Sequence, residues 1–421
     1  MRSIYITIYA LFFLCLNGTA QTEPIPFALN TTKENRAKEY RNLVNNSINK
    51  NLSLVLSDST EEYWEDAFYA MESINYRSVL VDKKIYSAFD SLEKRTVGFQ
   101  RALLELAWAI YPTEFVLQIR SFIKQTRSLK IFAIGAEYIL MNKKDKATLN
   151  LLRLDFTNLN SVIHVSYPDP IIISLVERLN KKYNKTPPLA DLLDTGFLKN
   201  QIVLYSFQRK NRNYPGLAMV RGKDGRFIKE ETGKYFFVSQ LARSMSNMPG
   251  YLTNGNTPQG IFKITGFDVS KGSFIGPTTN IQMVLPFERS PDVADSIPQL
   301  LGHDYKKLLP ASWQEYHPVF EAYYAGRAGR TEIIAHGTTV NPAYYKHQPW
   351  YPISPTQGCL CSKEIWSEIN GIRLVSDQQK LVNALQKAGG ANGYCVVIEI
   401  DDQQKLVSLQ EILPYLNKKI K

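Results

Sequence analysis

Cysteine and histidine are scarce in this sequence, which contains only four cysteines and five histidines among 421 residues. Domains stapled by disulfides or built around several metal centres need more of both, so these classes of protein are disfavoured. Cys15 lies in an apolar N-terminal run, which leaves Cys359, Cys361 and Cys395 beyond it. An odd number leaves at least one thiol free, even if Cys361 and Cys395 form a disulfide, which the sequence leaves open.

Long hydrophobic runs are also lacking. The one at residues 4–16 is short for a bilayer span and follows a single basic residue, Arg2. Small residues in Gly18-Thr19-Ala20 then match a signal peptidase site. Residues 1–20 are therefore predicted to be a secretory signal peptide, with an uncleaved membrane anchor as the alternative. The protein is expected to be secreted or periplasmic.

Acidic residues are too few to balance the basic ones, since 39 Asp and Glu face 50 Lys and Arg and give a net charge of +11. Loss of Arg2 with the signal peptide leaves +10 (11 − 1). A positive surface favours anionic partners such as cell-wall polymer or lipid headgroups. Export argues against nucleic acid as a partner. With 44% hydrophobic and 21% charged residues, the chain can bury a core, and its length suggests two or three domains.

Apolar residues recur at helical spacing in residues 21–190, which we expect to form an all-α domain. The clearest helices are predicted over 63–74, 99–110, 115–122 and 131–141. Short helices in pairs favour a HEAT-like solenoid or, equally, an irregular helical bundle. The surface of this domain is a candidate site for a protein partner.

The residue pattern changes from helical spacing to short strand-like runs after the paired prolines of the 185–188 segment. This segment is the best candidate for a linker. Residues 191–421 are expected to form a mainly β domain, a barrel or a sandwich, so the fold class is α+β. Strands are predicted over 201–207, 217–221, 261–264, 281–287, 332–335 and 394–400, with a hairpin turn at 222–225.

The candidate catalytic residues lie around Cys359, which follows Gly358. A His336-Gly337 pair lies upstream, with the histidine 23 residues before the cysteine (359 − 336). A nucleophilic thiol needs a base, a turn that exposes sulfur, and backbone N–H groups aimed at a developing oxyanion. Ser362 is a candidate N-cap for a helix ending near Asn370. The N-terminus of that helix would favour the thiolate.

These motifs resemble the catalytic domain of the L,D-transpeptidase family. Its signature is a His-Gly pair, a loop and Ser/Thr-x-Gly-Cys, which matches His336-Gly337 and Thr356-x-Gly358-Cys359. Thr257-Pro258-x-Gly260-x-Phe262 resembles a strand entry of the family, and 394–400 is similar to its closing strand. The likeness covers about 198–402, so the sequence resembles a secreted murein L,D-transpeptidase with an added helical N-terminal region.

The resemblance implies a role for each matching residue. Cys359 would be the nucleophile that forms a thioester with a stem peptide, and His336 would be the base. The carbonyl of Gly337 would orient the imidazole in place of the carboxylate of a usual triad. Backbone N–H groups of Cys359, Gly358 and Gln357 would form the oxyanion hole.

Three features depart from the family pattern. Gln357 stands where many members have a second histidine, and Cys361 stands where the family usually has an arginine. The stretch between the two motifs is also long and aromatic. The candidates for binding substrate are Thr356, Tyr345 and Trp350. No cofactor or metal is expected, because a zinc site at His336, Cys359, Cys361 and His347 would need an unusually short Cys-x-Cys spacing.

The resemblance therefore predicts a cysteine acyltransferase of cell-wall biogenesis and cell shape, acting on peptidoglycan stem peptides to form 3→3 cross-links. It also implies that a β-lactam such as a carbapenem would acylate Cys359. An L,D-carboxypeptidase, which passes the same thioester to water, is the first alternative. A catalytically inactive protein that binds cell-wall polymer is the second.

Overall fold

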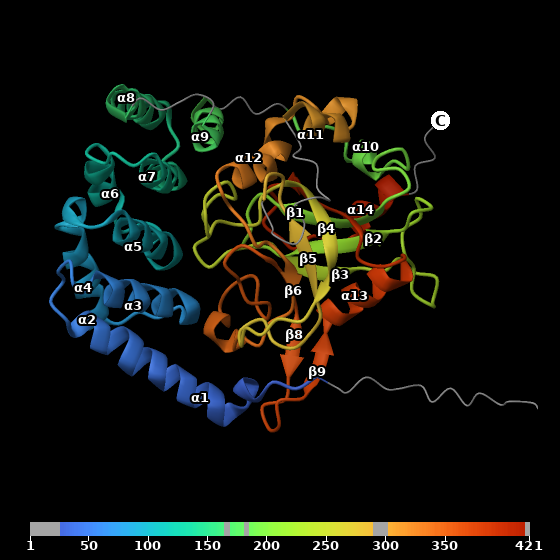
Figure 1. Ribbon diagram of the computed structural model, residues 1–421, viewed down its shortest axis with the longest axis horizontal. Helices are drawn as coiled ribbons and strands as arrows, with labels where there is room; N and C mark the ends of the chain where they lie inside the picture. Colours follow the sequence, from blue (N-terminus) through green and yellow to red (C-terminus); the bar gives the residue numbers. More distant parts are fainter. Residues whose placement is uncertain (1–25, 164–168, 181–184, 289–301, 417–421) are drawn as a thin grey trace, which may run out of the picture.

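The computed structural model describes residues 26–163, 169–180, 185–288 and 302–416 (Figure 1). It contains a helical half followed by a half built on a closed β-barrel, in agreement with the predicted α+β class. The predicted signal peptide lies outside the described residues. Within the described ranges, no helix combines the length and the apolar character needed to cross a bilayer.

The helices of the first half follow one another along an arc beside the barrel (Figure 1). The predicted helices over 63–74, 99–110, 115–122 and 131–141 are confirmed as α3, α5, α6 and α7. The elements are α1 (Lys33–Asn42), the π-helix η2 (Leu43–Lys50), α2 (Asn51–Ser53), α3 (Glu61–Ile74), α4 (Val79–Phe89), α5 (Val97–Ile110), α6 (Val116–Ile123), α7 (Leu129–Asn142), α8 (Lys146–Ile163) and α9 (Pro170–Asn180). Side chains of Ser78, Thr96 and Ser128 cap α4, α5 and α7.

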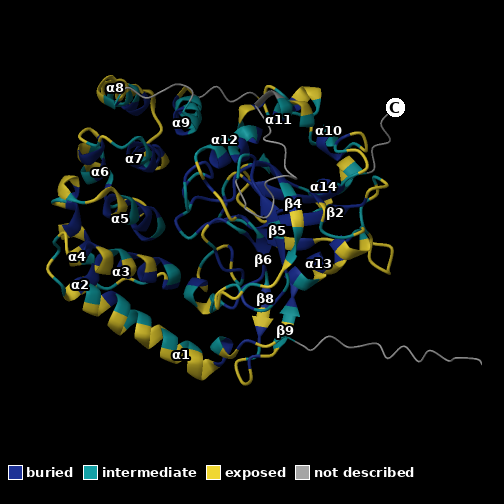
Figure 2. Cartoon of the chain, viewed as in Figure 1, coloured by how far each residue is buried: buried dark blue, intermediate teal, exposed yellow. Residues whose placement is uncertain are grey.

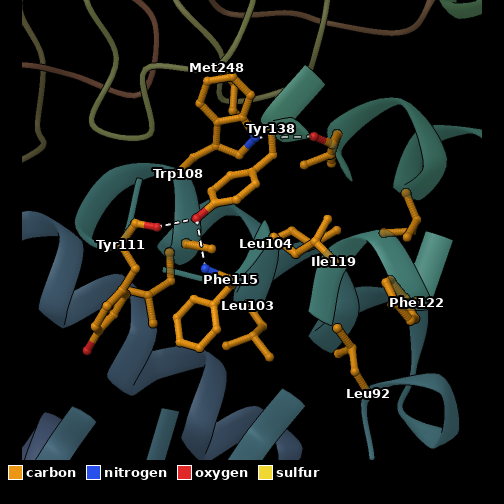
Figure 3. Close-up of a cluster of buried hydrophobic side chains, with 14 of the residues drawn as sticks. Leu92, Leu103, Leu104, Trp108, Tyr111, Phe115, Ile119, Phe122, Tyr138 and Met248 are labelled. Atoms are coloured by element: carbon orange, nitrogen blue, oxygen red, sulfur yellow. Dashed lines mark hydrogen bonds between the residues drawn. The ribbon is translucent and has the colours of Figure 1, made fainter. Parts of the chain in front are cut away.

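Aromatic side chains with hydrogen-bonded polar atoms fill the core of this half (Figure 3). The indole N–H of Trp108 donates to the carbonyl of Ile134 at 3.2 Å, and the Tyr138 hydroxyl contacts the carbonyl of Tyr111. Met248, which comes from a loop of the barrel half, packs into the same buried cluster. Since the two halves share this core, the helices are fixed against the barrel.

The sheet closes in the order β1-β10-β4-β5-β6-β7-β3-β2, with β1/β10 and β6/β7 parallel. Its strands are β1 (Ile202–Arg209), β2 (Gly216–Arg221), β3 (Val238–Leu241), β4 (Gly260–Asp268), β5 (Asn280–Val284), β6 (Ala335–His336), β7 (Leu360–Ser362) and β10 (Gly393–Asp401). A separate hairpin pairs β8 (Glu364–Trp366) with β9 (Arg373–Ser376). The α-helices in the described part of this half are α10 (Leu189–Leu193), α11 (Gly302–Leu308), α12 (Glu321–Arg327), α13 (Asp377–Lys387) and α14 (Leu409–Leu416).

Both faces of β1 are buried, which explains the apolar run over residues 202–205 at its start. Leu204 belongs to one cluster together with side chains of α13, and Tyr205 belongs to another cluster with side chains of α10, α12 and α14. Figure 2 shows the barrel strands as mainly buried, whereas α1 has no buried residue. A barrel is one of the two architectures that the strand pattern predicted.

One sequence-based expectation near Cys359 is wrong. The segment after it forms β7 and β8 and no helix, because Leu360 and Cys361 are buried and pair with β6 and β3. Tertiary pairing here overrides the N-capping signal of Ser362. The structure also answers the question of the disulfide, which the sequence left open, since Cys361 and Cys395 are buried and free. They lie on β7 and β10, which are not neighbours in the barrel.

Candidate active site

The turn that carries Cys359 requires a glycine before the sulfur. Gly358 has φ +122°, and an added Cβ there would collide with the guanidinium of Arg330 and the carbonyl oxygen of Gly255. The Thr356 hydroxyl closes the turn, since it accepts from the N–H of Gly358 at 3.0 Å and donates to the carbonyl of Cys359 at 2.9 Å. Thr356 therefore shapes the backbone around the nucleophile.

The upstream Thr-Pro-x-Gly motif holds the same turn. The hydroxyl of Thr257 donates to the carbonyl of Gly358 at 2.8 Å across 101 residues of sequence. Gly260, with φ +142°, begins β4, and an added Cβ there would collide with the side chains of Tyr305 and Ala322. The two motifs that carry the family resemblance are thus in direct contact.

His336 lies at the end of β6 and is 4% exposed. Its Nδ1 contacts the carbonyl oxygen of Gly337. Because a carbonyl oxygen only accepts, we place the proton on Nδ1, which leaves a lone pair on Nε2. Burial lowers the pKa of His336 below its usual 6.5. The imidazole is therefore neutral at neutral pH and competent to accept a proton.

Strand pairing brings the segments that carry His336 and Cys359 side by side. His336 pairs with Cys361 across the parallel β6/β7 ladder, and Cys359 directly precedes β7. Both side chains line one cavity of about 250 Å³.

The helical half forms one wall of this cavity. The predicted site residues Tyr345, Thr356 and Gln357 line it from the barrel half. The lining residues from the helical half are Asn30, Arg36, Glu39, Leu43, Tyr69, Ser73 and Ile74. Tyr345 joins the two halves, because its hydroxyl donates to the carbonyl of Ser73 on α3 at 2.9 Å.

Trp350 is not in the position predicted for a substrate-binding residue. It is 4% exposed and packs with Leu241, Ile353 and Cys361 behind the cavity. The guanidinium carbon of Arg243 lies 3.9 Å from the centre of its ring. Trp350 therefore supports the wall of the site and does not line the cavity.

The thiol itself rests in the protonated form. Cys359 is half-buried, and its Sγ donates to the carbonyl of Glu332 at 3.5 Å. Burial raises the pKa of the Cys359 thiol, although the N–H of Ile334 and the charge of Arg330 act in the opposite direction. The expected helix-stabilised thiolate is thus replaced by a thiol that needs a base. The N–H of Gly358 already donates to Thr356, so the amides of Gln357 and Cys359 are better placed to hold an oxyanion.

Sequence reasoning missed Arg330. Its side chain is buried and donates to the carbonyls of Gly255 at 2.6 Å and Asn256 at 2.8 Å, and it also contacts that of Gly250. Burial lowers the pKa of Arg330 only to about 10, so it stays cationic at neutral pH. Because these partners are neutral carbonyls, its charge still acts on Cys359. It supplies a guanidinium beside the turn, whereas Cys361 occupies the position where the resemblance expects one.

Glu364 on β8 is a second residue that sequence reasoning missed. Its carboxyl is buried, accepts from the hydroxyls of Thr278 and Ser376 at 2.6 Å each, and lies where an added Cβ of Gly337 would be. The N–H of Thr338 acts on the same carboxyl and lowers its pKa. That N–H and the carbonyl of Gly337 belong to one peptide group. The carboxyl therefore lies against the peptide whose oxygen faces the imidazole of His336.

Glu364→Gln is expected to change how reactivity depends on pH. Burial raises the pKa of Glu364 to about 7, so its carboxyl is protonated below that pH and ionised above it. Only the ionised form strengthens the acceptor that holds His336. At pH 8 we expect Cys359 of the variant to be alkylated about tenfold more slowly than that of wild type, because one charge-assisted interaction is lost. At pH 5.5 we expect the two proteins to react at similar rates.

Iodoacetamide labelling between pH 5.5 and 8.5 measures this difference. A ratio of rates that stays constant across the range would show that Glu364 does not act through its charge. We do not expect the variant to be less stable than wild type. Because the folded state raises the pKa of Glu364 above 4.5, ionisation of this carboxyl lowers the stability of the wild-type protein as the pH rises from 4.5 to about 7.

Comparisons with known proteins leave the family open, since no family model matches this chain and neither a curated protein nor a solved structure gives a significant match.

Proposed function

We propose that this protein is a cysteine acyltransferase of cell-wall metabolism, an L,D-transpeptidase that joins peptidoglycan stem peptides by 3→3 cross-links. The observation that carries the proposal is the shared cavity of Cys359 and His336, in which Nδ1 of the imidazole faces the carbonyl of Gly337. The order and spacing of the motifs around these residues resemble that family. The barrel half would then be the catalytic domain, and the helical half would complete its substrate cavity.

The first half-reaction would form a thioester. Nε2 of His336 takes the proton of the Cys359 thiol as the sulfur attacks the carbonyl carbon of the third stem residue. The tetrahedral intermediate collapses, and the carbon–nitrogen bond to the terminal D-alanine breaks. The imidazolium gives its proton to the leaving amine, which restores the neutral imidazole.

The second half-reaction would transfer the acyl group. The side-chain amine of another stem attacks the thioester carbon, an amide bond forms and the carbon–sulfur bond breaks. His336 takes a proton from the attacking nitrogen and returns it to the departing sulfur. Water in place of the amine gives an L,D-carboxypeptidase, the alternative with the same chemistry at Cys359.

Incubation with a carbapenem tests the proposal directly. We expect the intact protein to gain the mass of one carbapenem and peptide mapping to place the adduct on Cys359, while the buried Cys361 and Cys395 stay unmodified. Burial raises the pKa of both of these thiols, which makes them poor nucleophiles. Absence of an adduct on folded protein would favour the inactive wall-binding protein.

Product analysis separates the two enzymatic alternatives. With a disaccharide tetrapeptide as substrate, a cross-linked dimer is the expected product. Tripeptide as the only product would overturn transfer and leave hydrolysis. A Cys359→Ala variant should give neither product and serves as the control for contaminating activity.

A further inference from the structure

A second cavity, which we call the acidic cavity, adjoins the one that holds Cys359. It has a volume of about 240 Å³ and lies between α3, α5 and a loop of the barrel half. The two cavities share four lining residues, which are Tyr69, Met245, Thr356 and Gln357. Since Thr356 and Gln357 belong to the turn that carries the nucleophile, a ligand in the acidic cavity would lie beside the thioester.

The charge of this cavity is opposite to that of the whole protein. Its ionisable lining comprises Glu65, Asp66, Glu72, Glu105 and one cation, Arg101, in a chain with a net charge of +11. Arg101 pairs with Glu105 at 3.4 Å, and Asn254 donates to the other oxygen of Glu105 at 3.0 Å. The pairing of Glu105 leaves the remaining acidic side chains in excess.

Glu72 is the most informative of these side chains. It is 9% exposed, and among the described residues its carboxyl has neither a hydrogen bond nor an ion pair. A buried carboxylate without a partner is strongly disfavoured in a folded protein. The arrangement is understandable if a cation from outside the chain supplies the missing partner.

We propose that the acidic cavity binds the primary ammonium group of the acyl acceptor, with Glu72 as its main counter-ion. This inference rests on the proposed acyl transfer and assigns a binding site to the acceptor amine. An ammonium group is compact, carries three donors and suits a small cavity lined by carboxylates. Water would gain nothing from this charge, so the cavity favours transfer over hydrolysis.

Glu72 would also help to prepare the amine for attack. An ammonium must lose a proton before its nitrogen can attack the thioester. Burial and the neighbouring Glu105 raise the pKa of Glu72 well above 4.5, which makes its carboxylate a stronger proton acceptor than an exposed one. The transfer then consumes thioester and ammonium, yields amide and thiol, and releases one proton to solvent.

Binding to a Cys359→Ala variant tests the proposal without any acyl chemistry. The probes are a stem tetrapeptide with lysine at its third position and the same peptide with norleucine there. We expect calorimetry to show about tenfold tighter binding of the lysine peptide, a difference typical of one buried charged contact. With Glu72→Gln added, the preference should fall below about threefold, and with Glu72→Asp, which keeps the charge, most of it should remain.

Glu62→Gln is the matched control, because Glu62 is an exposed carboxylate on the same helix and does not line the cavity. Equal binding of the two peptides, or a preference that survives Glu72→Gln, would overturn the proposal. Titration with Ca²⁺ covers the other cation class, and Glu72-dependent binding of Ca²⁺ without a lysine preference would also overturn it. The wild-type protein could prefer the lysine peptide and yet not be acylated by carbapenem. This result would support the amine site and contradict the proposed thioester chemistry.

Discussion

His336→Ala is expected to slow carbapenem acylation of Cys359 by about 10²–10⁴-fold, the usual contribution of a general base. The size of this effect follows from the resting state of the sulfur. Burial raises the pKa of the Cys359 thiol, so little thiolate exists at neutral pH without a base. Burial also lowers the pKa of His336, so the imidazole is unprotonated and ready to act. The rate is measured by quenching the reaction and recording the intact mass of the protein.

His347→Ala provides the control for this variant. His347 is an exposed histidine in the loop between the two motifs and is absent from the lining of the cavity. We expect its replacement to leave the acylation rate within about twofold of wild type, as for most surface substitutions. If His336→Ala acylated as fast as His347→Ala, the thiol would be reacting without the imidazole, and the mechanism proposed for both half-reactions would fail.

Local sequence patterns predicted part of the secondary structure. The helices α3, α5, α6 and α7 were predictable because each buries one face, and apolar residues at helical spacing record that face directly. Strands β1, β2 and β10 were predictable from their short apolar runs, and the turn between 222 and 225 from its Asp-Gly pair. Gly358 was identified correctly as a position that needs glycine, because its φ lies in the left-handed region.

Features created by distant contacts were not predictable in the same way. The wall of the cavity includes Asn30, whose side chain donates to Thr339 across 309 residues of sequence. The sequence placed Glu364 in the first turn of a helix. Its partners Thr278 and Ser376 come from other elements, so no local pattern indicates that they contact it. Local propensity also favoured a helix after Ser362, whereas strand pairing on both sides of β7 decided its conformation. Single-sequence patterns carry no record of such pairings.

Arg330 illustrates the same limit at the centre of the site. An arginine 29 residues before the nucleophile (359 − 330) is usually a surface residue, and nothing local marks it as buried. Its place is set by distant contacts, because the guanidinium fills the space left by the missing side chain of Gly358 and donates to carbonyls of residues 250–256. This is also why its charge can act on the sulfur with little screening.

Arg330→Met is expected to raise the pKa of the Cys359 thiol by about one unit or more, since a cation near an ionisable group typically shifts its pKa by 1–3 units. Alkylation by iodoacetamide at pH 7.5 should then slow by about tenfold or more. The variant also leaves buried carbonyls without donors, so some loss of stability is expected. The decisive measurement is therefore the pH at which alkylation reaches half its maximum, recorded only on protein that circular dichroism shows to be folded.

Two further variants separate the charge of Arg330 from its packing. Arg330→Lys keeps the charge but loses the planar fork, so its thiol pKa should lie closer to that of wild type than to that of Arg330→Met. Arg226→Met removes an exposed guanidinium that pairs with Asp224 far from the site in sequence, and it should leave the thiol pKa unchanged. If Arg330→Met and Arg330→Lys shift the pKa equally, the guanidinium acts by holding the Gly358 turn in place. If neither variant shifts it, the positive charge has no part in activating the sulfur, and activation rests on His336 alone.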